Sequence, residues 1–260
     1  MRNAFASVVC MLFASAASAQ PPAWVSIKGQ VVLPEQEPIP VIRPLGPIRI
    51  DANHCLANGP LPDEKLLVNP KNRGIKNVVV WLRPAGMDPK AKFDPKDIHP
   101  LDAKRKPETV TITQPCCLFI PRVLAARVGD TIEVKNPAPV NHNFFWTSAA
   151  NGEININIPP GGKHVFGNPL VPESSPIAYR CTIHPWMIGY VRVFDHPYFA
   201  ITDADGRFEI KSAPAGNWSL VYWHESVGFK GGKAGRFGDA LAIPPNDKTL
   251  EMKPTDFLVK

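Results

Sequence analysis

Proline is spread along the whole chain, and this constrains the fold more than any other feature of the sequence. The 260 residues include 30 prolines and 18 glycines. Proline lacks a backbone N–H and breaks helices and central strands from within, so a helix bundle or a doubly wound α/β domain is not expected. Hydrophobic residues make up 44% of the chain and charged residues 20%, which argues against wholesale disorder. We therefore expect a globular protein of short strands and many turns.

Short runs rich in β-branched and aromatic residues recur between turn signals such as Gly129-Asp130 and Pro214–Gly216, a pattern typical of β-sandwiches. The expected strands are Trp24–Val32, Lys76–Leu82, Thr109–Thr113, Val123–Val128, Thr131–Lys135, Ile177–Cys181, Tyr190–Phe194, Arg207–Lys211 and Trp218–Trp223. Two polar or proline-rich segments, Pro34–Lys65 and Pro84–Pro107, are expected to be connectors, and Gly228–Gly238 a mobile loop.

The N-terminus predicts export. Residues 1–19 have one early positive charge, Arg2, a short apolar run, and the small-residue pattern Ala17-Ser18-Ala19 of a cleavage site. Cleavage after Ala19 would leave a periplasmic or secreted chain with no integral membrane segment. The net charge of the whole chain is +6. No Lys/Arg run reaches five residues, so nucleic-acid binding is not expected.

Export makes disulfides possible for the four cysteines beyond the signal, which are Cys55, Cys116, Cys117 and Cys181. Cys181 is part of a different pattern, described next. If Cys181 has that other use, at most one intramolecular bridge forms among the remaining three, with one thiol left over. The alternative is that all three thiols are free, since sequence alone does not show proximity.

The strongest chemical signal is a set of four soft and borderline metal ligands. Cys181, His184 and Met187 follow a Cys-x2-His-x2-Met pattern between two expected strands, and His142 lies upstream near another. Two imidazoles, a thiolate and a weak thioether suit copper that alternates between two oxidation states. Zinc would accept the two imidazoles and the thiolate but gains little from methionine. A degenerate site or another metal is the alternative interpretation.

This constellation resembles the cupredoxins, and the ligand loop is most similar to that of the amicyanins. The resemblance covers roughly residues 108–195 and implies a Greek-key β-sandwich, expected over residues 105–196, with one type 1 copper. It implies that Asn143 pairs with Thr182 and braces the loop, and that Pro185 and Trp186 belong to an apolar surface through which electrons pass. It also implies a disulfide from Cys55 to the vicinal pair, with Cys117 preferred.

A second pattern resembles the carboxypeptidase regulatory-like family, which has a small transthyretin-like sandwich. It comprises Asp203–Ile210, Pro214–Gly216 and Ser219–Trp223. The opening strand usual in that family is absent before residue 200, but similar segments occur upstream at Lys28–Val32 and Asn77–Leu82. We therefore expect one split sandwich, residues 24–86 plus 197–258, with the copper domain inserted. The alternative is a simple row of three modules. The arrangement resembles exported bacterial proteins labelled methylamine-utilisation-like.

These features predict an exported one-electron carrier that docks to redox partner proteins. No His-x-His pair of a trinuclear copper cluster and no Gly-x-Ser-x-Gly motif occurs in the sequence, so enzymatic activity is not expected. Two alternatives remain open. One is a carbohydrate- or protein-binding sandwich in which copper is ancillary. The other is periplasmic copper storage or delivery.

Overall fold

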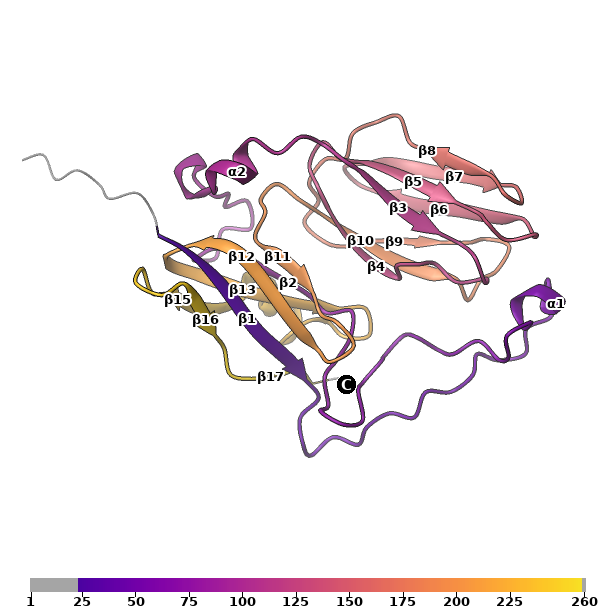
Figure 1. Cartoon of the computed structure of the whole chain (residues 1–260), viewed down its shortest axis with the longest axis horizontal. Helices are drawn as coiled ribbons and strands as arrows, with labels where there is room; N and C mark the ends of the chain where they lie inside the picture. Colours follow the sequence, from indigo (N-terminus) through magenta and orange to yellow (C-terminus); the bar gives the residue numbers. More distant parts are fainter. Residues whose placement is uncertain (1–22, 259–260) are drawn as a thin grey trace, which may run out of the picture.

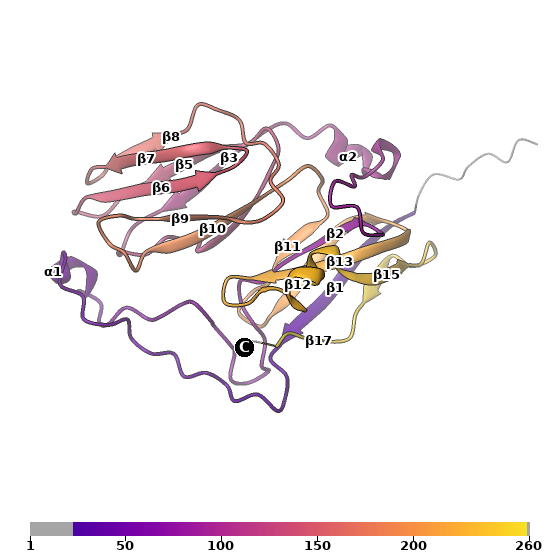
Figure 2. The same cartoon turned by 180° about the vertical axis from the view of Figure 1, so that it is seen from behind.

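The protein consists of two β-sandwiches that lie side by side, as the two opposite views of the computed structural model show (Figures 1 and 2). The structure describes residues 23–258. The expected signal peptide, residues 1–19, lies outside the described residues. The expected all-β fold class is confirmed. Within the described part of the chain, no helix is long and apolar enough to cross a membrane.

One sandwich, here called the terminal sandwich, is built from both ends of the chain. Its first sheet has the order β12-β1-β16, with β17 also paired to β1, and its second has the order β11-β2-β13-β14, with β15 paired to β13. The bounds are β1 Trp24–Val32, β2 Val79–Pro84, β11 Phe199–Ile201, β12 Arg207–Pro214, β13 Gly216–His224, β14 Gly228–Phe229, β15 Asp239–Ile243, β16 Thr249–Glu251 and β17 Thr255–Asp256.

The terminal sandwich holds together because its two sheets share one apolar core. Ile27 of β1, Leu82 of β2 and Ile210 of β12 are all fully buried in it, together with Tyr198 and Phe257. β1 pairs antiparallel with β12, which lies about 180 residues later in the chain. Strands from the two ends of the chain are therefore neighbours, and the other sandwich is inserted between them in sequence.

The inserted sandwich, here called the central sandwich, has sheets of order β4-β10-β9-β6-β7 and β3-β5-β8. Its strands are β3 Thr109–Thr113, β4 Val123–Arg127, β5 Thr131–Lys135, β6 His142–Ser148, β7 Gly152–Ile158, β8 Lys163–Val165, β9 Ile177–Arg180 and β10 Ile188–Phe194. Side chains from both sheets alternate inward and fill the core, as expected for packed sheets. The largest are Phe144, Trp146 and Tyr179.

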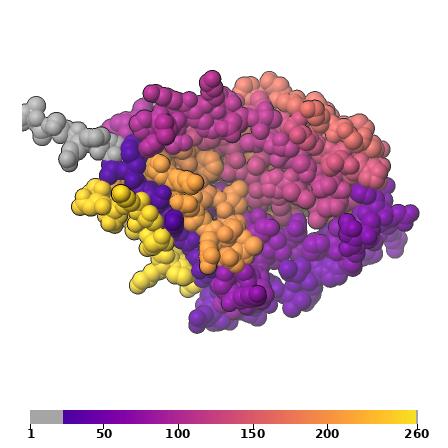
Figure 3. Space-filling view, in the orientation of Figure 1, coloured from indigo at the N-terminus to yellow at the C-terminus, as the bar shows by residue number. Residues whose placement is uncertain are grey.

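Two connectors tie the sandwiches together. The first connector, residues 34–65, carries the short helix α1 (Ala52–Cys55) and lies along the central sandwich (Figures 1 and 3). Leu45 and Ile48 pack against the central core, and Leu61 is part of it. The first connector is therefore a strap across the central sandwich rather than a free linker.

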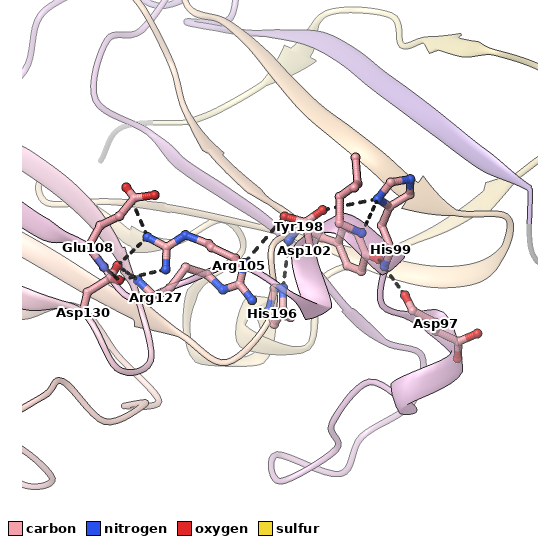
Figure 4. Close-up of polar contacts among 10 residues, drawn as sticks. Asp97, His99, Asp102, Arg105, Glu108, Arg127, Asp130, His196 and Tyr198 are labelled. Carbon is pink, nitrogen blue, oxygen red and sulfur yellow. Dashed lines mark hydrogen bonds and ion pairs between the residues drawn. The ribbon is translucent and has the colours of Figure 1, made fainter.

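The second connector, residues 85–108, contains η1 (Pro95–Asp97) and α2 (Pro100–Ala103) and binds both sandwiches (Figure 4). Arg105 forms a two-pronged ion pair with buried Asp130 of the central sandwich, with N–O distances of 2.8 and 3.1 Å. On the other side, the Tyr198 hydroxyl donates to the Asp97 carbonyl and accepts from the His99 N–H. These contacts attach the second connector to both sandwiches.

Several strand predictions match the structure closely, and one loop prediction is wrong. β1, β3 and β5 have the expected bounds, whereas the strands β6 to β8 were not anticipated.

The segment 228–238, expected to be a mobile loop, forms β14 and a 3-10 helix, η2 (Gly232–Phe237). Its glycines serve tight turns, since Gly231 and Gly238 have φ of 77° and 75°. The Lys230 N–H donates to the Tyr222 carbonyl and holds the segment against β13.

Candidate metal centre

The four expected ligands come from two neighbouring parts of the central sandwich. His142 is the first residue of β6, while Cys181, His184 and Met187 lie in the loop between β9 and β10. β6 and β9 are antiparallel neighbours, with Trp146 opposite Tyr179. Sheet pairing therefore brings the start of β6 to the end of β9, and places His142 next to Cys181 although they are distant in sequence.

The donor atoms of these residues converge. Nδ1 of His142 lies 3.0 Å from Nδ1 of His184, and Sγ of Cys181 lies 3.8 Å from the same His184 nitrogen. All three side chains are completely buried. They form one of two groups of potential metal ligands in residues 23–258, with ligand atoms within 4.8 Å of one another. Such a group can hold a single ion.

The spacing and chemistry of the three donors fit a metal ion. Metal–nitrogen bonds of about 2.0–2.1 Å and metal–thiolate bonds of about 2.3 Å leave ligand atoms roughly 3 to 4 Å apart. Nε2 of His142 is buried without a hydrogen-bond partner among the described residues. The polar contact of this ring is therefore on its Nδ1 side, which faces His184. Thiolate and imidazole together favour copper or zinc over a hard cation.

Burial keeps both imidazoles in the neutral form that metal binding requires. Desolvation, with a smaller contribution from the nearby His184, lowers the pKa of His142 to about 4. Desolvation also lowers the pKa of His184, although the adjacent Asp51 opposes this shift. Near neutral pH, protons therefore compete only weakly with a metal ion for the imidazoles of His142 and His184.

Backbone hydrogen bonds shape the ligand loop. The Cys181 N–H donates to the Met187 carbonyl at 3.1 Å, and the Met187 N–H donates to the His184 carbonyl at 2.9 Å. The Cys181 sulfur accepts from the N–H groups of Asn143 at 3.2 Å and His184 at 3.4 Å. Donors of this kind stabilise negative charge on a thiolate. Met187 is fully buried in the same core cluster.

Asn143 joins β6 to the ligand loop through its side chain. Its Oδ1 accepts from the Thr182 N–H at 3.2 Å, and its Nδ2 donates to the Ile156 carbonyl at 3.1 Å and to Asn155 Oδ1 at 3.0 Å. One amide thus links strands β6 and β7 to the residue that follows Cys181. The structure therefore brings the expected pair, Asn143 and Thr182, into contact.

The first connector covers the outer side of His184. Asp51 Oδ2 lies 2.9 Å from His184 Nε2, and His184 has no exposed surface. Helix α1 follows Asp51 directly, and its Cys55 is joined to Cys117 by a disulfide. No local motif marked Asp51, because it lies 133 positions from His184 in sequence. Only the path of the connector reveals it.

Pro185 and Trp186 occupy different environments. Pro185 is exposed, while Trp186 is half-buried and its indole N–H donates to the Cys117 carbonyl at 3.1 Å. Trp186 also packs against the ring of His184, with 5.2 Å between ring centroids. The ring of His184 therefore does not reach the surface. The surface next to it is formed by Pro185, part of Trp186 and the first connector.

Comparisons with known proteins add a distant likeness in fold. No protein-family model matches the chain, and no curated protein matches it. A purple cupredoxin from Nitrosopumilus maritimus is 24% identical, with a TM-score of 0.27, over 32% of this chain and 98% of the other. An amicyanin variant in the Cu(I) state is 21% identical, with a TM-score of 0.29, over 33% of this chain and 82% of the other.

A copper-containing nitrite reductase from Thermus scotoductus is 24% identical, with a TM-score of 0.31. This match spans 35% of the present chain and 23% of the reductase. At such TM-scores these likenesses are too distant to support a function. The interpretation of the site therefore depends on its own ligand residues.

Proposed function

We propose that the protein is an exported type 1 copper protein that carries single electrons between redox partner proteins. The observation that carries this proposal is the buried convergence of His142, Cys181 and His184, with donor atoms 3.0 and 3.8 Å apart. Met187 would be a weak fourth ligand, because it closes the same loop and is fully buried. The copper ion would supply one-electron redox chemistry.

The chain's own residues would make that chemistry fast and reversible. A thiolate and thioether favour Cu(I) while imidazoles accept either oxidation state, so neither state is strongly preferred. The ligands project from strands and a hydrogen-bonded loop, which limits their movement when the charge of the site changes. Burial excludes water and keeps the imidazoles available as neutral donors.

The covering of His184 favours a carrier over a copper-delivery protein. Rapid transfer of an ion needs ligands that an acceptor can reach, whereas His142, Cys181, His184 and Met187 are all without exposed surface. The disulfide between Cys55 and Cys117 also fastens the connector over the site. Electron transfer tolerates such a cover. It requires that the partner protein come close to the copper, but not that a ligand of the partner contact the ion.

A potentiometric titration of the copper-loaded protein tests this proposal. A carrier should be reduced and reoxidised reversibly in a single one-electron step, with no loss of copper over repeated cycles. A copper chelator present in excess should remove the ion slowly. Loss of copper on each reduction, or transfer to the chelator within the mixing time, would instead support storage or delivery.

A further inference from the structure

A second candidate site lies between the two sandwiches, away from the metal ligands. It is a partly open cavity of about 230 Å³, lined by residues of β2, β10, β14, η2 and the second connector. Strand β10 starts directly after Met187, and its far end supplies Arg192 and Phe194 to this cavity. The cavity is here called the interdomain pocket. Neither its residues nor its chemistry is used by the metal centre.

Arg192 contributes a half-buried positive charge to the pocket. Its guanidinium lies over the rings of Trp81 at 5.3 Å and Phe194 at 4.9 Å, and makes one long hydrogen bond of 3.4 Å to the Val193 carbonyl. Its Nε is buried without a partner, and among residues 23–258 it forms no ion pair with a carboxylate. Burial lowers the pKa of Arg192 to about 10. Asp195 and Glu173 act on this half-buried charge from a distance, but neither pairs with it, so the guanidinium still has hydrogen-bond donors to offer an anion.

The other walls of the pocket are also positive. Arg83 is only 8% exposed, and its guanidinium donates to the carbonyls of Gly86, Asp88 and Phe237 rather than to a carboxylate. The basic lining residues are Arg83, Lys90, Lys92, Arg192 and Arg236, against the two carboxylates Glu173 and Asp195. Five positive groups minus two negative groups leave an excess of three. The Glu173 carboxylate is engaged elsewhere, by Ser148 and the Ala149 N–H.

Aromatic rings supply the remaining surface of the pocket. Trp81, Phe93, Phe194, Phe229 and Phe237 all line it. Flat apolar walls with a few charged groups are the usual composition of a small-molecule site. Arginine is well suited to a carboxylate because its planar fork matches the two oxygens. A volume of about 230 Å³ accommodates a ligand of about one ring.

We propose that the interdomain pocket binds a small organic anion, consisting of one carboxylate attached to a flat apolar ring. Arg192 receives the carboxylate, and the aromatic walls receive the ring. Exposed Arg236, which lies 4.7 Å from the Phe237 ring, guides the anion at the rim. Because no metal ligand takes part, this proposal does not depend on the copper function.

Isothermal titration of the full chain with benzoate, benzamide and sulfate tests the proposal. Benzoate should bind saturably at one site, and neutral benzamide, which has nearly the same shape, should bind at least about tenfold more weakly. Arg192→Gln should weaken benzoate binding by at least about tenfold. The matched control is Arg180→Gln, because Arg180 also lies over an aromatic ring, Phe145, but is exposed and remote from the pocket. It should bind benzoate like the parent.

A second variant and the sulfate titration complete the test. If Arg192→Gln does not fold, as judged by circular dichroism, Arg236→Gln at the exposed rim should still reduce benzoate affinity several-fold. Equal binding of benzoate and benzamide, no saturable binding of benzoate, or unchanged benzoate affinity in both variants would overturn the proposal. Sulfate binding as tight as that of benzoate would assign the pocket to inorganic anions and would also contradict it.

Discussion

Asp51 and His184 form a carboxylate–imidazole contact of 2.9 Å, although they belong to different parts of the fold. Asp51 lies on the first connector, and His184 lies in the loop of the central sandwich that carries the proposed ligands. The contact fixes the Nε2–H tautomer of His184, which leaves the Nδ1 lone pair directed at His142 and Cys181. The connector therefore orients a ligand as well as covering it.

Asp51→Asn should weaken Cu(II) binding and raise the reduction potential. The amide can still accept a hydrogen bond from His184 but no longer places a negative charge beside it, so the more positive oxidation state is stabilised less. Loss of a carboxylate that is hydrogen-bonded to a metal-binding histidine typically lowers metal affinity by about 10- to 100-fold. Competition titration and voltammetry measure both effects. Asp63→Asn is the control, because Asp63 lies on the same connector and bonds to the Lys65 N–H. Equal shifts in both variants would refute a specific role for Asp51.

Asn143→Ala should loosen the ligand loop. It removes the acceptor of the Thr182 N–H and the amide that donates three contacts to β7, and it leaves buried polar groups without partners. We expect the free energy of unfolding to fall by about 1 to 3 kcal/mol, as measured by urea denaturation. Asn157→Ala removes only the longer contact of 3.3 Å to the same amide and should have a much smaller effect. If the two variants unfold alike, Asn143 is not the brace.

Cys55→Ser should destabilise the chain and speed up the loss of copper. The disulfide joins residues 62 positions apart, and loop-closure entropy for such a span corresponds to about 4 kcal/mol. Without it, the connector can separate from His184 and admit a chelator. Denaturant titration and the rate of chelation measure the two consequences. Cys116→Ser, which alters a free and half-buried thiol, should leave both values nearly unchanged. A slow, parent-like chelation rate in Cys55→Ser would contradict the capping role.

Stability should decrease in mild acid because of His196. This histidine is buried, and desolvation together with Arg192 and Arg127 lowers its pKa to about 3 in the folded state. In the unfolded chain this histidine binds a proton near pH 6.5, so the stability that depends on its neutral form is fully present above that pH. This stability is lost as the pH falls toward 3, at up to about 1.4 kcal/mol per pH unit. His196→Phe should show a shallower decline between pH 6.5 and 5. Identical slopes would exclude this assignment.

The all-β class was predictable because proline and short alternating runs leave few other solutions. The bounds of β1, β3 and β5 were predicted correctly because apolar or β-branched residues recur at every second position in these segments, between turn residues. β6 was not predicted from the sequence, because this strand starts with the polar pair His142-Asn143, which belongs to the proposed metal centre. Residues chosen for chemistry weaken the pattern that local structure would otherwise show.

The proposed ligands were recognisable because three of them share one short loop, Cys181 to Met187. The contribution of the first connector was not recognisable. Asp51 acts through a long-range approach that depends on where a proline-rich segment crosses the central sandwich, and no periodicity encodes that path. The pairing of Arg192 with Trp81 is likewise a contact between two sandwiches. Sequence spacing carries little information about such contacts.

The visible absorption spectrum of the Cu(II)-loaded protein tests the central claim most directly. If Cys181, His142 and His184 hold one copper as proposed, the parent should show an intense thiolate-to-copper charge-transfer band at one copper per chain. Cys181→Ser should lose that band, because a hydroxyl is a poor replacement for a thiolate. A parent protein that binds copper without this band, or a Cys181→Ser variant that keeps it, would contradict the account.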